Sequence, residues 1–287
     1  MRKRRTRKEG RIERDHDMFE VFKAHSSDNQ NTRERLRLLF SLQLIDSPCP
    51  LFVISTKRCA ITLYISIYCK WGNPYYIGNI VYCMNATFLV FEGIDGSGKR
   101  TLCEYSQEII QSAGFETKKY QYPDYKSPWG KIINDFLSRS RELDVSIQFL
   151  TYATDIAKDQ QKIREHLKKG VFVLADRYIT STVAFQCARG FDLDKAIRFI
   201  HMFEFLSPDI IFYMNVSPQT GRLRKKGQKG DLDRHEADIE FLKKVGAMYR
   251  KLYDQQFLAK KWIEIDANKE LSQVKSTIEG EISRILR

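Results

Sequence analysis

Short apolar runs and longer stretches with helical spacing alternate from residue 84 to the end of the chain. The run Val171–Ala175 is apolar at every position, which is typical of a strand buried on both faces of a parallel sheet. Between Asp144 and Lys169, apolar residues recur at helical spacing, and Gly170 follows as a helix C-cap. The predicted strands are Phe88–Phe91, Phe115–Tyr122, Val171–Ala175, Asp209–Val216 and Trp262–Ile265. The predicted helices are Thr101–Ser112, Gly130–Leu137, Asp144–Lys169, Thr182–Ala188, Leu193–Leu206, Glu236–Phe257 and Glu270–Leu286.

This alternation predicts an α/β fold with a five-stranded parallel sheet and helices on both faces. Ligands of such sheets bind at the carboxyl ends of the strands. The residues that follow the predicted strands are therefore the first candidates for a functional site.

Residues 1–83 do not share this pattern. Arg2–Arg14 is a basic run with little apolar content, and we expect it to be disordered. Phe19–Leu44 has weak helical spacing, and strand-like runs occur at Leu51–Ser55 and Ile61–Tyr68. Met84 stands just before the first strand of the regular pattern. We therefore predict a largely disordered extension over residues 1–83 and a folded domain over 84–287, with Met84 as the hypothetical natural start and the extension as a possible artefact of gene prediction.

The chain has 287 residues, of which 43% are hydrophobic, and a net charge of +12. Residues 1–83 hold 15 Lys/Arg against 8 Asp/Glu, so the rest of the chain is only mildly basic. This charge suits an enzyme of anionic nucleotides, with any nucleic-acid contact confined to the basic tail. No apolar run reaches the roughly 18–20 residues of a membrane span, and a secretory signal is absent. None of the six cysteines forms a C-x-x-C pair, which favours free thiols and the cytoplasm.

A glycine-rich stretch joins the first predicted strand to the first predicted helix. Its residues are Gly93, Ile94, Asp95, Gly96, Ser97, Gly98, Lys99, Arg100 and Thr101. The glycines let the backbone curl and direct its N–H groups to one point, where the helix N-terminus and the mobile charge of Lys99 favour an anion. This pattern predicts a loop for the phosphates of ATP, and the alternative is a glycine turn without a ligand.

Arg100 departs from the phosphate-loop pattern. The pattern has Ser or Thr at this position, because its hydroxyl binds Mg²⁺, and Thr101 points about 100° further around the helix. Arginine offers no lone pair to a metal. We favour an Arg100 that folds away to solvent, with Mg²⁺ held by ATP oxygens, water and Asp176; the alternative is direct contact between Arg100 and a phosphate.

Asp176 and Arg177 follow a buried strand. A phosphoryl transfer needs two anions held in line with their repulsion neutralised, and an arginine at a strand end can bind phosphate oxygens of both substrates. Asp176 would help to hold Mg²⁺ through water. The alternative for this dipeptide is a surface ion pair.

Several motifs now occur in order along residues 84–287. They are Phe91–Lys99, Asp176-Arg177-Tyr178, Ser181–Gln186 and Gly230–Glu236. This set resembles the thymidylate kinase family of P-loop nucleoside monophosphate kinases. The resemblance implies transfer of the ATP γ-phosphoryl group to dTMP, giving dTDP for dTTP biosynthesis, with Mg²⁺ and in a homodimer. It also implies that Lys99 and Arg177 are catalytic and that Asp95 faces the 3′-hydroxyl of the acceptor sugar.

The stretch Gly221–Arg234 resembles the mobile lid of this family, which closes over the phosphates and excludes water. Its expected lid residues are Arg224, Lys225, Lys229 and Arg234. The family pattern makes Arg224 the first candidate for the catalytic lid arginine, with Lys225 and Lys229 next. A solvated basic loop is the alternative.

The acceptor pocket resembles the family less closely. The expected monophosphate-binding residues are Asp95, Tyr122, Lys126, Tyr152, Arg177, Ser181, Phe185 and Gln186. Tyr152 can stack on thymine, Phe185 can crowd a ribose 2′-hydroxyl, and Gln186 can bond the base. Ile156, however, stands where the family has an arginine, and it cannot donate a hydrogen bond. A kinase of another nucleoside monophosphate and a weakly active nucleotide-binding protein therefore stay open as alternatives.

Overall fold

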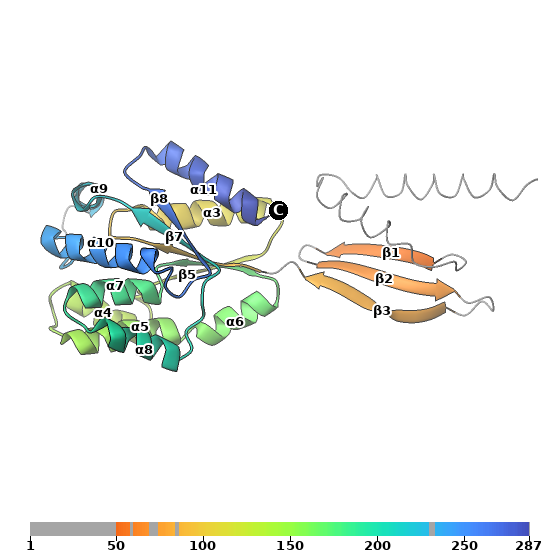
Figure 1. The fold of residues 1–287 in the computed structure, drawn as a ribbon, viewed down its shortest axis with the longest axis horizontal. Coiled ribbons are helices and arrows are strands. Elements are labelled where there is room, and N and C mark those ends of the chain that lie inside the picture. The colour runs from red at the N-terminus through yellow and green to blue at the C-terminus, as the bar shows by residue number, and fades with distance from the viewer. Residues whose placement is uncertain (1–49, 58–59, 69–73, 84–85, 230–232, 287) are drawn as a thin grey trace, which may run out of the picture.

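The structure is a computed structural model that describes residues 50–57, 60–68, 74–83, 86–229 and 233–286. Figure 1 shows its two sheets and their helices. The strands of the larger sheet are β4 (Phe88–Glu92), β5 (Thr117–Gln121), β6 (Phe172–Asp176), β7 (Ile210–Asn215) and β8 (Lys261–Asp266). The helices are α3 (Lys99–Ser112), α4 (Pro128–Leu137), α5 (Val145–Ala157), α6 (Gln160–Lys168), α7 (Ile179–Ala188), α8 (Leu193–Met202), α9 (Pro218–Lys229), α10 (Ile239–Asp254) and α11 (Leu271–Ile285).

The five strands lie in the order β5-β6-β4-β7-β8, and every neighbouring pair is parallel. The predicted five-stranded parallel sheet is therefore confirmed. β4 is central and β6 lies beside it, and every residue of both strands is buried. Their carboxyl ends bring the glycine-rich loop after β4 next to the residues that follow β6.

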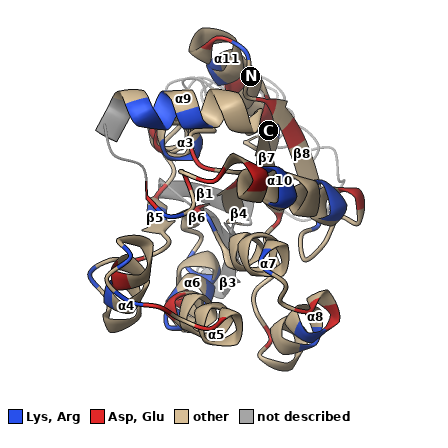
Figure 2. Cartoon of the chain, turned by 90° about the vertical axis from the view of Figure 1, so that its left-hand side faces the viewer, with Lys and Arg blue, Asp and Glu red and all other residues tan. Residues whose placement is uncertain are grey.

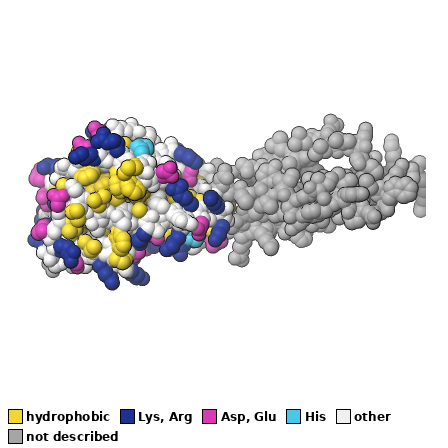
Figure 3. Space-filling model, turned by 90° about the horizontal axis from the view of Figure 1, so that it is seen from below, with side chains coloured by type: hydrophobic (Ala, Val, Ile, Leu, Met, Phe, Trp, Pro, Cys, Tyr) yellow, Lys and Arg dark blue, Asp and Glu magenta, His cyan; other side chains and the backbone are white. Residues whose placement is uncertain are grey.

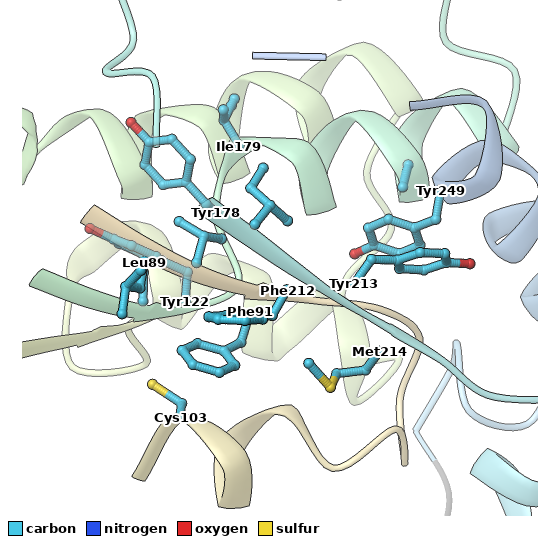
Figure 4. Close-up of a cluster of buried hydrophobic side chains, with 14 of the residues drawn as sticks. Leu89, Phe91, Cys103, Tyr122, Tyr178, Ile179, Phe212, Tyr213, Met214 and Tyr249 are labelled. Atoms are coloured by element: carbon cyan, nitrogen blue, oxygen red, sulfur yellow. The ribbon is translucent and has the colours of Figure 1, made fainter. Parts of the chain in front are cut away.

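Helices cover both faces of the sheet (Figures 1 and 2). α3 and α11 pack together on one face, and α5, α7 and α10 form the layer on the other. Figure 4 shows the core between them, where Phe91 and Phe212 of neighbouring strands stack with ring centroids 5.1 Å apart. Tyr249 of α10 stacks on Tyr213 of β7 at 5.7 Å. Among the described residues, no helix is both long enough and apolar enough to cross a bilayer.

The single helix predicted over Asp144–Lys169 is wrong, because the structure divides it into α5 and α6. At the break, the Lys158 ammonium donates to the Asp155 carbonyl at 2.7 Å. The N–H of Asp159 donates to the carbonyl of Ile156, three residues earlier, at 3.2 Å, so the last turn of α5 is tighter than an α-helical turn. The Asp159 carboxylate also accepts from Lys158 at 2.8 Å and from the Tyr122 hydroxyl at 3.2 Å. Local bonds of Lys158 and Asp159 and one contact from the distant Tyr122 thus accompany the end of α5, and a periodicity argument does not include them.

Residues 50–83 contain a second, antiparallel sheet of β1 (Pro50–Lys57), β2 (Ala60–Tyr68) and β3 (Pro74–Cys83), in that order. The two strand-like runs seen in the sequence fall within β1 and β2, whereas β3 was not predicted. The three strands fall within the predicted extension, and the division of the chain at residue 84 stays a prediction. The basic run, the weakly helical stretch and Met84 lie outside the described residues.

Candidate active site

The loop between β4 and α3 has the shape of a phosphate cradle. Gly93 and Gly96 have φ angles of 140° and 75°, and Gly98 is the N-cap of α3 with φ 88°. A side chain at Gly96 would clash as well, because its Cβ would lie 2.0 Å from the carbonyl oxygen of Gly221 in α9. The loop therefore requires glycine for its own curl and for the contact with α9.

The ammonium of Lys99 lies over this loop. It donates to the carbonyl of Ile94 at 2.6 Å and to the hydroxyl of Ser97 at 3.3 Å, and the residue is only 6% exposed. Burial, together with the nearby Arg177 guanidinium, lowers the pKa of Lys99 to about 7. The charge predicted to be mobile is thus enclosed at the centre of the loop.

Arg100 and Thr101 both point away from the loop. The Arg100 side chain is 69% exposed and donates to the Glu104 carboxylate at 3.3 Å, one helical turn later. Thr101 is also exposed. The orientation of Arg100 agrees with the favoured interpretation, in which the residue folds to solvent.

Asp95 and Arg177 join the glycine-rich loop to the end of β6. The guanidinium donates to the Asp95 carboxylate at 2.5 Å, to the Gly93 carbonyl at 3.1 Å and to the Ser181 hydroxyl at 3.1 Å. Burial opposes ionisation of Asp95, but the charges of Arg177 and Lys99 outweigh it and hold the Asp95 pKa well below its usual range. Arg177 has a φ of 70°, in the left-handed region, and these bonds hold it there.

Glu92, the last residue of β4, is a buried carboxylate that sequence reasoning did not select. It is fully buried, and its Oε1 accepts from the backbone N–H of Tyr178 at 3.0 Å and of Ser181 at 3.1 Å. The Thr180 hydroxyl donates to the same oxygen at 2.5 Å. Oε2 accepts from the hydroxyls of Ser181 at 2.5 Å and Tyr249 at 2.8 Å. Glu92 therefore fixes the start of α7, and through Ser181 it supports Arg177.

A pocket opens beside this pair of charges. It encloses about 550 Å³, including the part open to solvent. The predicted site residues that line it are Asp95, Tyr122, Tyr152, Arg177, Ser181, Phe185 and Gln186. Lining residues that the sequence did not single out as binding groups are Pro123, Tyr125, Leu137, Asp155, Ile156, Tyr178, Thr182 and His235. Lys126 is exposed and does not line the pocket, and the phenol of Tyr125 lies there instead.

Gln186 presents an unpaired amide in this pocket. The residue is fully buried, and neither its Oε1 nor its Nε2 has a hydrogen-bond partner. Buried amides are normally paired, because an unpaired one costs roughly 1–3 kcal/mol. The amide thus offers one acceptor and two donors to a polar ligand.

The predicted lid residues separate into different environments. Residues 218–229 form helix α9, which carries the blue cationic residues seen in Figure 2. Arg224 donates to the Ala267 carbonyl at 2.8 Å, while Lys225 pairs with Glu236 at 3.3 Å and its charge contributes to the low pKa of Asp95. Arg234 pairs with Glu142 at 2.5 Å. The Lys229 side chain lies outside the described residues.

Asp176 ends β6 next to the glycine-rich loop and is 8% exposed. Burial raises its pKa, although the charges of Lys99 and Arg177 oppose this. In the described ranges, no group of three or more His, Cys, Asp or Glu side chains could hold a metal ion.

A phosphate loop at the central strand, a pocket beside it and an arginine between the two define a P-loop nucleotide kinase. The family model of thymidylate kinase matches residues 91–278. The chain belongs to the thymidylate kinase family.

Curated relatives agree with this assignment. Thymidylate kinase of Arabidopsis thaliana is 32% identical over 193 residues, covering 67% of this chain and 68% of the relative. Thymidylate kinase of Dictyostelium discoideum is 29% identical over 67% of this chain and 82% of its own length. The enzyme of Schizosaccharomyces pombe is 30% identical over 69% and 91%, respectively.

Proposed function

We propose that this protein transfers the γ-phosphoryl group of ATP to dTMP, giving dTDP. The observation that carries the proposal is the Asp95–Arg177 pair, which borders both the phosphate loop and the pocket. A guanidinium in that position can bind oxygens of the donor and the acceptor phosphate together. The reaction in this proposal comes from the names of the relatives, and the residues assigned to it come from the geometry of the site.

The loop amides and Lys99 hold the β- and γ-phosphates of ATP. On binding, the Lys99 ammonium exchanges the Ile94 carbonyl for phosphate oxygens, which are stronger partners. Arg177 then aligns the two phosphates, and the loose transition state is stabilised mainly by positioning and charge. Asp95 orients the acceptor through its 3′-hydroxyl.

The acceptor base lies against Tyr152, and the Gln186 amide pairs with its polar edge. Thymine presents one acceptor and one donor side by side, which matches the unpaired amide. Tyr122 and Phe185 close the sides of the pocket, and Phe185 leaves little room for a ribose 2′-hydroxyl. The second candidate is a kinase of another monophosphate. Ile156 favours it, because this pocket residue stands where the family has an arginine and cannot donate a hydrogen bond to thymine. The Gln186 amide does not exclude it, because a glutamine amide can turn over and pair with cytosine equally well.

Lys225 is the better supported lid cation. Arg224, the first choice from the family pattern, donates to the Ala267 carbonyl. Lys225 instead pairs at 3.3 Å with Glu236, which follows the pocket-lining His235, and its charge helps to lower the pKa of Asp95. Movement of the part of α9 beyond Gly221 would bring Lys225 to the transferred phosphoryl group and exclude water.

Mg²⁺ accompanies ATP in this proposal and neutralises charge on the transferred group. Asp176 fits the role of an indirect ligand, because it is a strand-end carboxylate within the field of Lys99 and Arg177. Magnesium keeps several waters and needs few protein oxygens, so the missing hydroxyl at position 100 does not prevent its binding.

The test is coupled ADP release by the full chain with dTMP, dUMP, dCMP, dGMP and dAMP in turn. We expect dTMP to give the highest kcat/KM. Arg177→Ala should lower kcat and raise the KM for dTMP together, whereas the exposed control Arg284→Ala on α11 should change neither. A higher kcat/KM for another monophosphate would favour the second candidate, and unchanged kinetics of Arg177→Ala would place Arg177 outside the site.

We also propose a homodimer formed through the face that carries α5 and α8. Figure 3 shows apolar side chains gathered on this face, and Ile147 and Leu150 of α5 are 49% and 45% exposed. Exposed apolar surface of this kind marks an interaction site. Sedimentation of the full chain should give twice the monomer mass, and Leu150→Glu should give the monomer. The cytoplasmic location stays a prediction.

A further inference from the structure

His235 lies in the short connection between α9 and α10. Its backbone N–H donates to the Asp233 carboxylate at 2.9 Å, as does that of Glu236. The imidazole is 4% exposed and packs against the rings of Phe185 and Phe241, with centroids 5.3 and 5.2 Å away. The ring is therefore held firmly in one place.

The Nε2 atom of His235 has no hydrogen-bond partner, although the residue lines the acceptor pocket. An unpaired nitrogen on a buried side chain costs free energy, whereas an apolar ring would fill the same aromatic surroundings without that cost. Packing alone does not explain a histidine here. The nitrogen is available to a ligand of the pocket.

The imidazole lies at the charged end of the pocket. Phe185 contacts both the imidazole and the Arg177 guanidinium, which lies 5.1 Å from the Phe185 ring. Burial and the nearby Arg189 lower the pKa of His235 to about 3, although Asp95 opposes this. The ring is thus neutral near neutral pH, and a neutral imidazole carries one donor and one acceptor nitrogen.

We propose that Nε2 of His235 forms a hydrogen bond with the 3′-hydroxyl of the acceptor nucleotide. A hydroxyl can donate one bond and accept another. It would donate to the Asp95 carboxylate, which can only accept, and accept from the His235 N–H. His235 is then a specificity-determining residue that favours acceptors with a free 3′-hydroxyl. The inference rests on the proposed function, because it assumes a nucleoside monophosphate in the pocket.

The test compares dTMP with 2′,3′-dideoxythymidine 5′-monophosphate as acceptors of the full chain. The wild-type protein should prefer dTMP by about tenfold or more in kcat/KM, as expected for a buried hydrogen bond. His235→Phe should lose about tenfold with dTMP and less than about twofold with the dideoxy compound. His235→Gln keeps a nitrogen at the same reach and should recover part of the preference for dTMP. His166→Gln, a change of a histidine on α6 that does not line the pocket, is the control and should keep the wild-type preference for dTMP.

A second measurement needs no variant. The ¹⁵N resonance of His235 Nε2 should shift on addition of dTMP and stay in place on addition of the dideoxy compound. Equal losses with both acceptors in His235→Phe, or equal shifts with both, would show a structural role and overturn the inference while leaving the kinase activity in place. A wild-type protein that releases no ADP with any monophosphate would overturn the proposed function as well.

Discussion

Glu92→Gln is the sharpest test of how the site is held together. The substitution keeps the shape of the side chain and replaces one carboxylate oxygen with an NH₂ group, which cannot accept a hydrogen bond. Oε1 can keep its two backbone donors at 3.0 and 3.1 Å from residues 178 and 181. The new NH₂ group then faces the hydroxyls of Ser181 and Tyr249, which donate to Oε2 in the native protein.

The magnitude follows from these two bonds. A hydrogen bond to a charged group contributes about 1.5–3 kcal/mol, and a neutral one contributes about 0.5–1.5 kcal/mol. If the two hydroxyls turn to accept from the new NH₂ group, both bonds change from charged to neutral, which costs about 2–3 kcal/mol of the free energy of unfolding. The hydroxyls of Ser181 and Tyr249 also lie 3.1 and 3.5 Å from the Arg177 guanidinium, so a change in their orientation should lower kcat as well.

Urea unfolding of the full chain, followed by circular dichroism, measures the free energy, and the exposed Glu116→Gln is the matched control. We expect a lower midpoint for Glu92→Gln with an unchanged slope, and no change for the control. A loss below about 0.5 kcal/mol with an unchanged slope would refute the reasoning, because it would mean that these bonds contribute no more than surface contacts do.

Burial and the nearby Arg177 lower the pKa of Lys99 to about 7 in the free protein. Bound phosphate favours the charged ammonium, so ATP binding at about pH 8 should take up close to one proton. Calorimetry in buffers of different ionisation enthalpy measures this proton uptake. The uptake should fall as the pH drops through 7, and it should vanish in Lys99→Met. Zero uptake in the wild type would contradict the buried state of Lys99. Lys225→Ala should lower kcat more than Arg224→Ala, and the reverse order would return the catalytic lid role to Arg224. Arg100→Thr should reduce the free Mg²⁺ needed for half-maximal rate at saturating ATP and dTMP, because threonine adds an oxygen ligand. Lower activity of this variant at every Mg²⁺ level would mean that Arg100 binds phosphate.

The strands and the glycine-rich loop could be predicted because their signals are local. Val171–Ala175 is apolar throughout, and the three loop glycines occur within six residues, so neither inference needs a distant partner. The same locality made Arg177 recognisable, because it directly follows the end of a buried strand.

The supports of the site could not be predicted in this way. Glu92 was visible as a lone carboxylate in an apolar strand, but its five donors lie 86 to 157 residues away. Lys126 and Tyr125 are neighbours in sequence, and only the packing of the loop after β5 decides which one lines the pocket. The break after α5 likewise depends on Tyr122, which contributes a hydroxyl from another element.

The contact between Gly96 and Gly221 has a consequence for how this chain can change. The two backbones approach so closely that a Cβ on either residue would lie 2.0 to 2.5 Å from a carbonyl oxygen of the opposite segment. A residue with a side chain at either position would therefore force the two backbones apart. At Gly96 the positive φ adds backbone strain for any residue other than glycine. The first turn of α9 is therefore packed rigidly against the phosphate loop. On the proposed lid role of α9, any movement would have to arise beyond residue 221, and substitutions at the far end of the helix would leave its attachment to the phosphate loop unchanged.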